Sequence, residues 1–249
     1  IINYLFHNPK FLLLLINIIL YIIFKVIDIF KIYLRKSIMK QKTIKNIIDK
    51  QKDENVALTS EKFQPLKYGE LKKLVNKIAR QLSSQGISNK DRAAIVLPNG
   101  PHMATSFLAI SSFMSAAPLN PAYKTEEYEF YLNDLKPKIV LVEPNSSNKV
   151  LEVAKKLNIQ VCELKIKNNS PTGTFDLFKN ESDYNSPNEN DEALVLHTSG
   201  TTSRPKIVPL TNKNIFSSSS NISKTLNLSE IDHSLNIMPL FHIHGLIAV

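Results

Sequence analysis

Short apolar runs alternate with amphipathic segments from residue 68 to residue 164, and this alternation restricts the possible folds more than any other feature. The amphipathic segment that opens at Tyr68 carries apolar residues at every third or fourth position and ends at Gly86, as a helix does. Strands that alternate with helices are joined by crossovers, so the sequence predicts an α/β fold with partly parallel sheets covered by helices. Strands are expected at residues 92–97, 116–119, 139–142 and 159–164.

The remaining expected elements follow from the same patterns. Thr125 is predicted to cap a helix, because Glu126 and Glu127 would lie in its first turn, where the helix dipole favours acids. Residues 167–190 are rich in Asn, Ser, Pro and acids without periodicity, which predicts a solvated loop. Further helices are expected at 44–48, 103–114, 150–157 and from Thr211 through Leu226, and further strands at 55–59, 193–196 and 234–238.

The stretch from His197 to Pro209 concentrates residue types that bind phosphate, and it directly follows an apolar run. Phosphate oxygens are held by main-chain N–H groups, hydroxyls and Lys, and Gly lets the main chain come close. A Walker A loop does not fit, because Pro205 precedes Lys206 and Ile207 follows it. The sequence therefore predicts a different polyphosphate-binding loop; a Ser/Thr-rich surface loop without a ligand is the alternative. The stretch reads His-Thr-Ser-Gly-Thr-Thr-Ser-Arg-Pro-Lys-Ile-Val-Pro.

This order resembles the Thr-Ser-Gly-Thr-Thr-Gly-x-Pro-Lys-Gly motif of the adenylate-forming superfamily of acyl-CoA synthetases, luciferases and peptide-synthetase adenylation domains. Ser203 and Ile207 stand where most members have Gly. With Ser at position 203, the stretch most resembles the oxalyl-CoA synthetase branch of the family. Asn212 stands where the family usually has His. Two further blocks also resemble the family: Ala-Ala-Pro-Leu-Asn-Pro at 116–121, and Pro-Leu-Phe-His-Ile-His-Gly at 239–245, which in the family borders the acyl-substrate pocket.

The resemblance implies a two-step ligation that uses Mg-ATP, a small carboxylate and coenzyme A. The carboxylate attacks the α-phosphorus and expels pyrophosphate, and the coenzyme A thiol then attacks the acyl-adenylate and releases AMP. Lys206 and His242 would be catalytic, and His242 and His244 would bind the carboxylate. Imidazole donors suit a small dianion such as oxalate better than apolar walls do. The ATP phosphates would contact Thr198, Ser199, Gly200, Thr201, Thr202, Ser203 and Lys206.

Two other classes of function stay open. One is a coumarate-type or medium- or long-chain acyl-CoA ligase, or a peptide-synthetase adenylation domain. The other is a non-catalytic, membrane-attached ATP-binding relative, suggested by Ile207, Asn212 and the apolar N-terminus. Family members are longer, so the chain is expected to be an N-terminal fragment. It would hold the first part of the family's large N-terminal domain and end, incomplete, at Val249. The adenine, ribose and Mg²⁺ sites and a mobile lysine-bearing domain would lie beyond it, and the fragment alone is expected to be inactive and not to fold stably.

Positive charge is concentrated at the N-terminus. The chain carries 31 Lys and Arg residues and 22 Asp and Glu residues. Residues 1–52 contain ten of the basic and two of the acidic residues, so the rest of the chain has 21 basic and 20 acidic residues. Because the body of the chain has no basic, aromatic-interleaved face, a nucleic-acid partner is not expected. Hydrophobic residues make up 43% of the chain, which is enough for a buried core. The resemblance implies a peroxisomal or cytosolic location.

Residues 1–38 are an apolar and basic extension ahead of a domain expected at 39–249. No charge occurs from Phe11 to Phe24, but this run is shorter than the ~20 apolar residues that span a bilayer. One hypothesis is a membrane anchor through residues 11–34, the only expected membrane contact. The favoured alternative is translated upstream sequence ahead of Met39, because its Ile, Asn, Lys and Phe content is typical of AT-rich DNA.

Cys162 is the only cysteine, so an intrachain disulfide is impossible. Because it lies within an apolar run, it is predicted to be a small buried side chain rather than a nucleophile.

His242 and His244 lie two residues apart without a third ligand at a usual spacing, so no metal site is predicted. The alternative to a carboxylate-binding role for this pair is a structural one, in which one of the two histidines is buried and hydrogen-bonded.

Overall fold

The computed structural model describes residues 17–29, 41–198 and 205–248, and the chain divides into two units, Ile1–Gln41 and Lys42–Val249. In the first unit, residues 17–29 form a helix whose large apolar side chains are exposed, Phe24 by 65%. None of the helices in the described ranges is both long enough and apolar enough to cross a membrane. The anchor and the boundary at residue 38 stay predictions.

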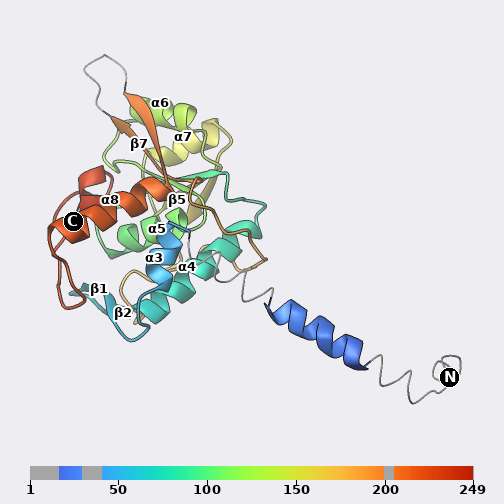
Figure 1. Cartoon of the computed structure of the whole chain (residues 1–249). Coiled ribbons are helices and arrows are strands. Elements are labelled where there is room, and N and C mark those ends of the chain that lie inside the picture. The colour runs from blue at the N-terminus through green and yellow to red at the C-terminus, as the bar shows by residue number, and fades with distance from the viewer. Residues whose placement is uncertain (1–16, 30–40, 199–204, 249) are drawn as a thin grey trace, which may run out of the picture. The chain divides into compact units, whose positions relative to one another are not determined.

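A six-stranded sheet forms the centre of the second unit (Figure 1), in the order β6–β5–β3–β4–β7–β8. The first five strands are parallel, and β8 is antiparallel to β7, so the predicted α/β fold with a partly parallel sheet is confirmed. The strands are β3 (Arg92–Val96), β4 (Ser115–Pro118), β5 (Ile139–Val142), β6 (Gln160–Glu163), β7 (Glu192–Thr198) and β8 (Lys206–Thr211). The sequence did not predict β8, which contains Pro209; an edge strand tolerates a proline.

Helices cover both faces of the sheet, because alternate residues of its buried strands point to opposite sides. In β3, Ala93 and Ile95 belong to one core cluster, and Ala94 and Val96 belong to the other. The connection from β3 to β4 runs in the opposite direction to that from β4 to β5, and right-handed crossovers then place their helices on opposite faces. The first face is covered by α3 (Ile44–Asp49), α4 (Tyr68–Ser83), α5 (Pro101–Ser111) and α8 (Asn212–Thr225), the second by α6 (Thr125–Leu135) and α7 (Val150–Lys156).

Most predicted helix ends lie where the sequence places them, with one correction. Gly86 has a φ of 74° two residues past the C-cap of α4, a conformation that glycine adopts without strain. The prediction that Thr125 caps α6 is wrong, because Lys124 is the N-cap and its main-chain N–H donates to Glu127 at 2.8 Å. The sequence also missed β2 (Phe63–Lys67), which pairs antiparallel with the predicted strand β1 (Val56–Ser60).

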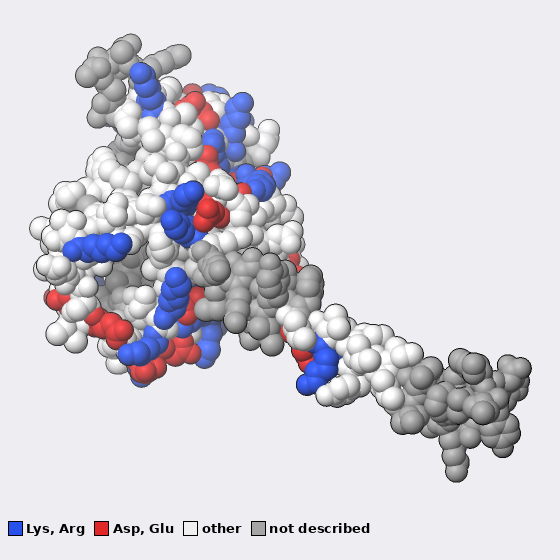
Figure 2. Space-filling model, viewed as in Figure 1, with Lys and Arg blue, Asp and Glu red and all other residues white. Residues whose placement is uncertain are grey.

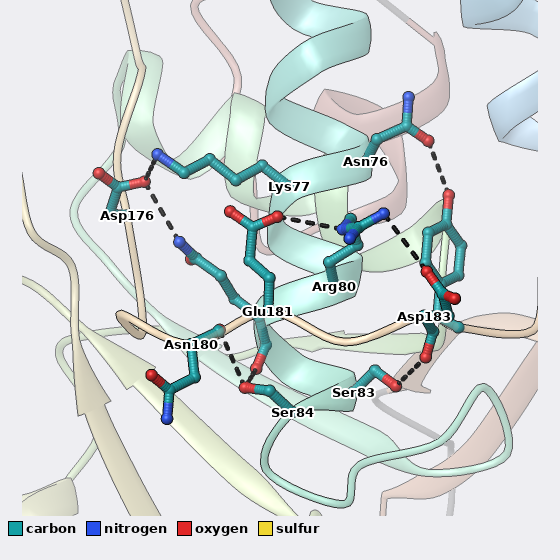
Figure 3. Close-up of polar contacts among 11 residues, drawn as sticks. Asn76, Lys77, Arg80, Ser83, Ser84, Asp176, Asn180, Glu181 and Asp183 are labelled. Atoms are coloured by element: carbon teal, nitrogen blue, oxygen red, sulfur yellow. Dashed lines mark hydrogen bonds and ion pairs between the residues drawn. The ribbon is translucent and has the colours of Figure 1, made fainter.

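The prediction of a solvated loop at 167–190 is wrong for its central part. Phe175 and Leu177 are 4% and 0% exposed and belong to the core. Residues 176–184, which we call the α4 strap, lie against α4 and are bound to it by polar side chains (Figure 3). Arg80 contacts Glu181 at 3.1 Å, and the buried Gln81 accepts a hydrogen bond from the main-chain N–H of Leu177 at 2.9 Å. From Leu177 onward, groups of α4 rather than a strand partner bind the main chain of the segment, and such contacts impose no periodicity on its sequence.

The predicted strand at 234–238 is also wrong. These residues have no regular structure, and Leu235 and Ile237 are 83% and 77% exposed. A strand needs a neighbour for its main-chain groups, and none of the described strands pairs with this segment.

The visible face of the second unit carries cationic and anionic side chains close to one another (Figure 2).

Candidate functional site

The carboxyl ends of the parallel strands share one edge of the sheet, and polar residues follow or end several strands there, among them the predicted phosphate contact Thr198. Asn99 follows β3, Asn120 follows β4, and Thr198 is the last residue of β7. After β3 the chain enters α5 on one face, and after β4 it enters α6 on the other. In open α/β sheets, ligands bind where successive helices diverge in this way, outside the carboxyl ends of the strands. This edge is therefore the candidate site.

The β7–β8 hairpin brings together the two ends of the predicted phosphate loop. Thr198 is paired with Lys206, and His197 is paired with Ile207. Both Thr198 and Lys206 are exposed. Cross-strand partners lie about 5 Å apart, so a hydroxyl and an ammonium group leave the hairpin at the same level. The predicted contacts Ser199, Gly200, Thr201, Thr202 and Ser203 lie outside the described residues.

The two histidines of the second predicted cluster lie on a turn that begins at Pro239. His242 and His244 are both exposed, so the alternative of one buried, hydrogen-bonded His is wrong. The turn folds tightly, because a Cβ atom at Gly245 would lie 2.4 Å from the carbonyl oxygen of Pro239. It continues into the π-helical turn η1 (His244–Ala248). Main-chain contacts thus shape the turn and leave both imidazoles at the surface, on a different element from Thr198 and Lys206.

Asn99 connects this turn to the sheet, and the sequence analysis assigned it no role. Its Oδ1 accepts a hydrogen bond from the N–H of Leu240 at 2.9 Å, and its Nδ2 donates to the carbonyl of Met238 at 3.4 Å. The only local signal was the Pro-Asn-Gly-Pro sequence at 98–101, which indicates a turn but not what the turn holds. One side chain therefore fixes the histidine-bearing turn to the carboxyl end of β3.

Behind the hairpin, α6 presents an aromatic layer. Burial raises the pKa of Tyr128 to about 12, and its hydroxyl donates to the carbonyl of Asn120 at 3.0 Å. Burial also raises the pKa of Tyr123, whose ring stacks on Tyr131 with centroids 4.8 Å apart. The phenols of Tyr123 and Tyr128 are therefore neutral at physiological pH and serve as packing groups.

Cys162 is buried, as predicted, and burial raises the pKa of its thiol to about 11. A neutral thiol is a poor nucleophile, so Cys162 has a structural role. Within the described parts of the chain, no group of three or more His, Cys, Asp and Glu residues is placed to hold a metal ion.

The start of α8 fixes the base of the hairpin. The helix expected from Thr211 is α8, and Thr211 is its N-cap, since its side chain accepts a hydrogen bond from the N–H of Asn214 at 3.2 Å. Asn212 is fully buried, and its Oδ1 accepts from the N–H of Ile44 at 3.1 Å. The residue at this position therefore joins α8 to α3, a role that the sequence analysis did not identify.

Residues 45–249 match the family described as AMP-binding enzyme. The chain belongs to this AMP-binding enzyme family. The AMP-binding chain is 38% identical to the oxalate–CoA ligase of Arabidopsis thaliana over 212 residues, which cover 82% of this chain and 41% of the relative. It is 36% identical to the oxalate–CoA ligase of Saccharomyces cerevisiae over 190 residues, 66% of this chain and 35% of the relative. The predicted resemblance is confirmed, and the chain spans about two fifths of the length of these relatives.

Solved structures agree with the AMP-binding fold. Apo MatB from Rhodopseudomonas palustris matches with a TM-score of 0.71 and 24% identity, over 84% of this chain and 42% of that chain. The o-succinylbenzoate CoA synthetase MenE from Bacillus subtilis, in complex with its acyl-adenylate intermediate, matches with a TM-score of 0.64 and 26% identity. This match covers 82% of this chain and 51% of that chain.

Proposed function

We propose that the protein containing this AMP-binding chain is an ATP-dependent acid–thiol ligase, which forms an acyl-CoA through an acyl-adenylate. The observation that carries the proposal is the pairing of Thr198 with Lys206 at the carboxyl edge of the sheet. A hydroxyl and a cation at the two ends of a Ser/Thr-rich loop can hold the phosphates of ATP while pyrophosphate forms as the leaving group. The names of the relatives and the acyl-adenylate complex of MenE support the same chemistry.

In this reaction Lys206 neutralises phosphate charge and Thr198 donates a hydrogen bond. Lys206 is exposed, so its ammonium group is accessible to a ligand. The hydroxyls and main-chain N–H groups of residues 199–203 complete the proposed cradle. Mg²⁺ would supply additional charge neutralisation, but the described residues offer it no cluster of ligands, and we assign it no step.

We propose oxalate as the carboxylate, with His242 and His244 as its contacts. Both imidazoles are exposed on a turn that Asn99 fixes to the end of β3, at the same edge of the sheet as Thr198. Imidazole N–H donors pair well with a small dianion, whereas fatty and aromatic acids require apolar walls. Two of the relatives are named oxalate–CoA ligases.

Pyrophosphate exchange into ATP tests both parts of the proposal on the full-length protein. With oxalate, fatty and aromatic acids compared side by side, oxalate should support the fastest exchange. Faster exchange with another acid would reject oxalate and keep the ligase; no exchange with any acid would reject the ligase.

The Lys206→Ala variant tests the role of the hairpin. Exchange should fall about 100-fold or more, because a group that stabilises developing charge is lost. The melting temperature should change little, since Lys206 is exposed. Lys213→Ala is the matched control, an exposed lysine on the adjoining helix α8 whose nearest carboxylate oxygen, on Glu189, lies 3.7 Å away. Equal exchange rates in the two variants would exclude Lys206 from phosphate binding.

A further inference from the structure

His197 lies one residue before the proposed phosphate contact Thr198, and its side chain is only 6% exposed. Its Nε2 is 2.8 Å from Oδ2 of Asp134 in the last turn of α6. A hydrogen bond to an ionised carboxylate is stronger than one between neutral groups. The contact joins residues 63 positions apart in the sequence.

Aromatic rings hold the imidazole in one orientation. The ring of Tyr131 meets His197 edge-on with centroids 4.7 Å apart, and the ring of Phe130 lies at 6.2 Å. Tyr131 is itself stacked on Tyr123. The imidazole is therefore fixed by packing as well as by its hydrogen bond, and its three partners, Phe130, Tyr131 and Asp134, all belong to α6.

The end of β7 has little other support from the sheet. The pairing between β4 and β7 consists of one residue pair, Ala116 with Leu194, whereas β7 pairs with β8 up to Thr198. The hairpin extends beyond the rest of the sheet alongside α6 (Figure 1). The position of its far end therefore depends on side chains, and His197 is the side chain there that bonds to α6.

We propose that His197 is a positioning residue, which Asp134 holds so that the end of β7 presents Thr198 and its partner Lys206 to the phosphates of ATP. The proposal rests on the proposed function. Loss of the contact would let the hairpin end move relative to the site, so MgATP binding would weaken. The rate at saturating MgATP would change less, because bound nucleotide restores the geometry.

The test compares variants of the full-length protein by calorimetric titration with MgATP and by pyrophosphate exchange. His197→Phe keeps the ring packing and removes the hydrogen bond, and Asp134→Ala removes the acceptor. Each should raise the Kd for MgATP about tenfold, the factor that corresponds to about 1.4 kcal/mol. The maximal exchange rate should stay within about twofold. Asp134→Asn keeps an oxygen acceptor and should raise the Kd less than Asp134→Ala does.

A matched control and a double variant separate positioning from general stability. Glu129→Ala removes another contact of α6, the 2.6 Å pair with Lys156 on α7, and should leave the Kd unchanged. The double variant His197→Phe/Asp134→Ala should bind no more weakly than either single variant, because both remove one interaction. Additive losses, or an unchanged Kd in the single variants, would overturn the positioning role while the ligase proposal stands. A wild-type protein that does not bind MgATP would overturn both.

Discussion

Asn212 shows at the scale of one residue how a buried amide fixes two distant segments. Its oxygen accepts from the N–H of Ile44, which begins α3 and so has no partner inside that helix. Asn212→Ala would leave this donor buried and unpaired. We expect the free energy of unfolding of the full-length protein to fall by about 1–3 kcal/mol, measured by urea denaturation.

Asn221→Ala is the control for this prediction, because Asn221 is an exposed asparagine on the same helix. Its effect should stay within about 0.5 kcal/mol. If the two variants unfolded at the same urea concentration, the hydrogen bond to Ile44 would contribute nothing measurable.

At the scale of elements, the α4 strap depends on charge. Burial alone would raise the pKa of Asp176, but the ammonium of Lys77, with Gln81 and Lys167, lowers it below its ordinary value. A carboxyl group whose pKa is lowered in the folded state stabilises the fold above its ordinary pKa and loses this contribution as the pH falls. Asp176→Asn should therefore lower the melting temperature near neutral pH, and the difference from wild type should shrink below about pH 4.

Asp183→Asn is the comparison within the same strap. Its carboxylate contacts Arg80 at 3.4 Å but is 99% exposed, and exposed ion pairs contribute little. Its melting temperature should match that of wild type at every pH. A pH-independent effect of Asp176→Asn would show that its packing, rather than its charge, holds the strap.

At the scale of the whole molecule, the described core residues all belong to the second unit. We therefore expect full-length protein that begins at Met39 to keep both its melting temperature and its pyrophosphate exchange rate. The measurement is a side-by-side thermal melt and exchange assay with and without residues 1–38. A clear loss of either property would show that these residues belong to the functional domain.

Patterns between near neighbours in the sequence determined much of this protein. Short apolar runs and helical spacing predicted the parallel strands β3–β7 and the helices that cover them, and the order of hydroxyls, Pro205 and Lys206 pointed to the AMP-binding family. These signals are local, because apolar runs, helix periodicity and turn chemistry depend on residues a few positions apart.

Tertiary structure alone decided the contacts between distant residues. The bond from Asn99 to Leu240 spans 141 positions, that from Asn212 to Ile44 spans 168, and that from His197 to Asp134 spans 63. The two residues of each contact belong to different parts of the chain, so no local sequence pattern predicts these contacts. The same holds for the α4 strap and for β8, whose main-chain groups find partners on α4 and β7 only once the chain has packed.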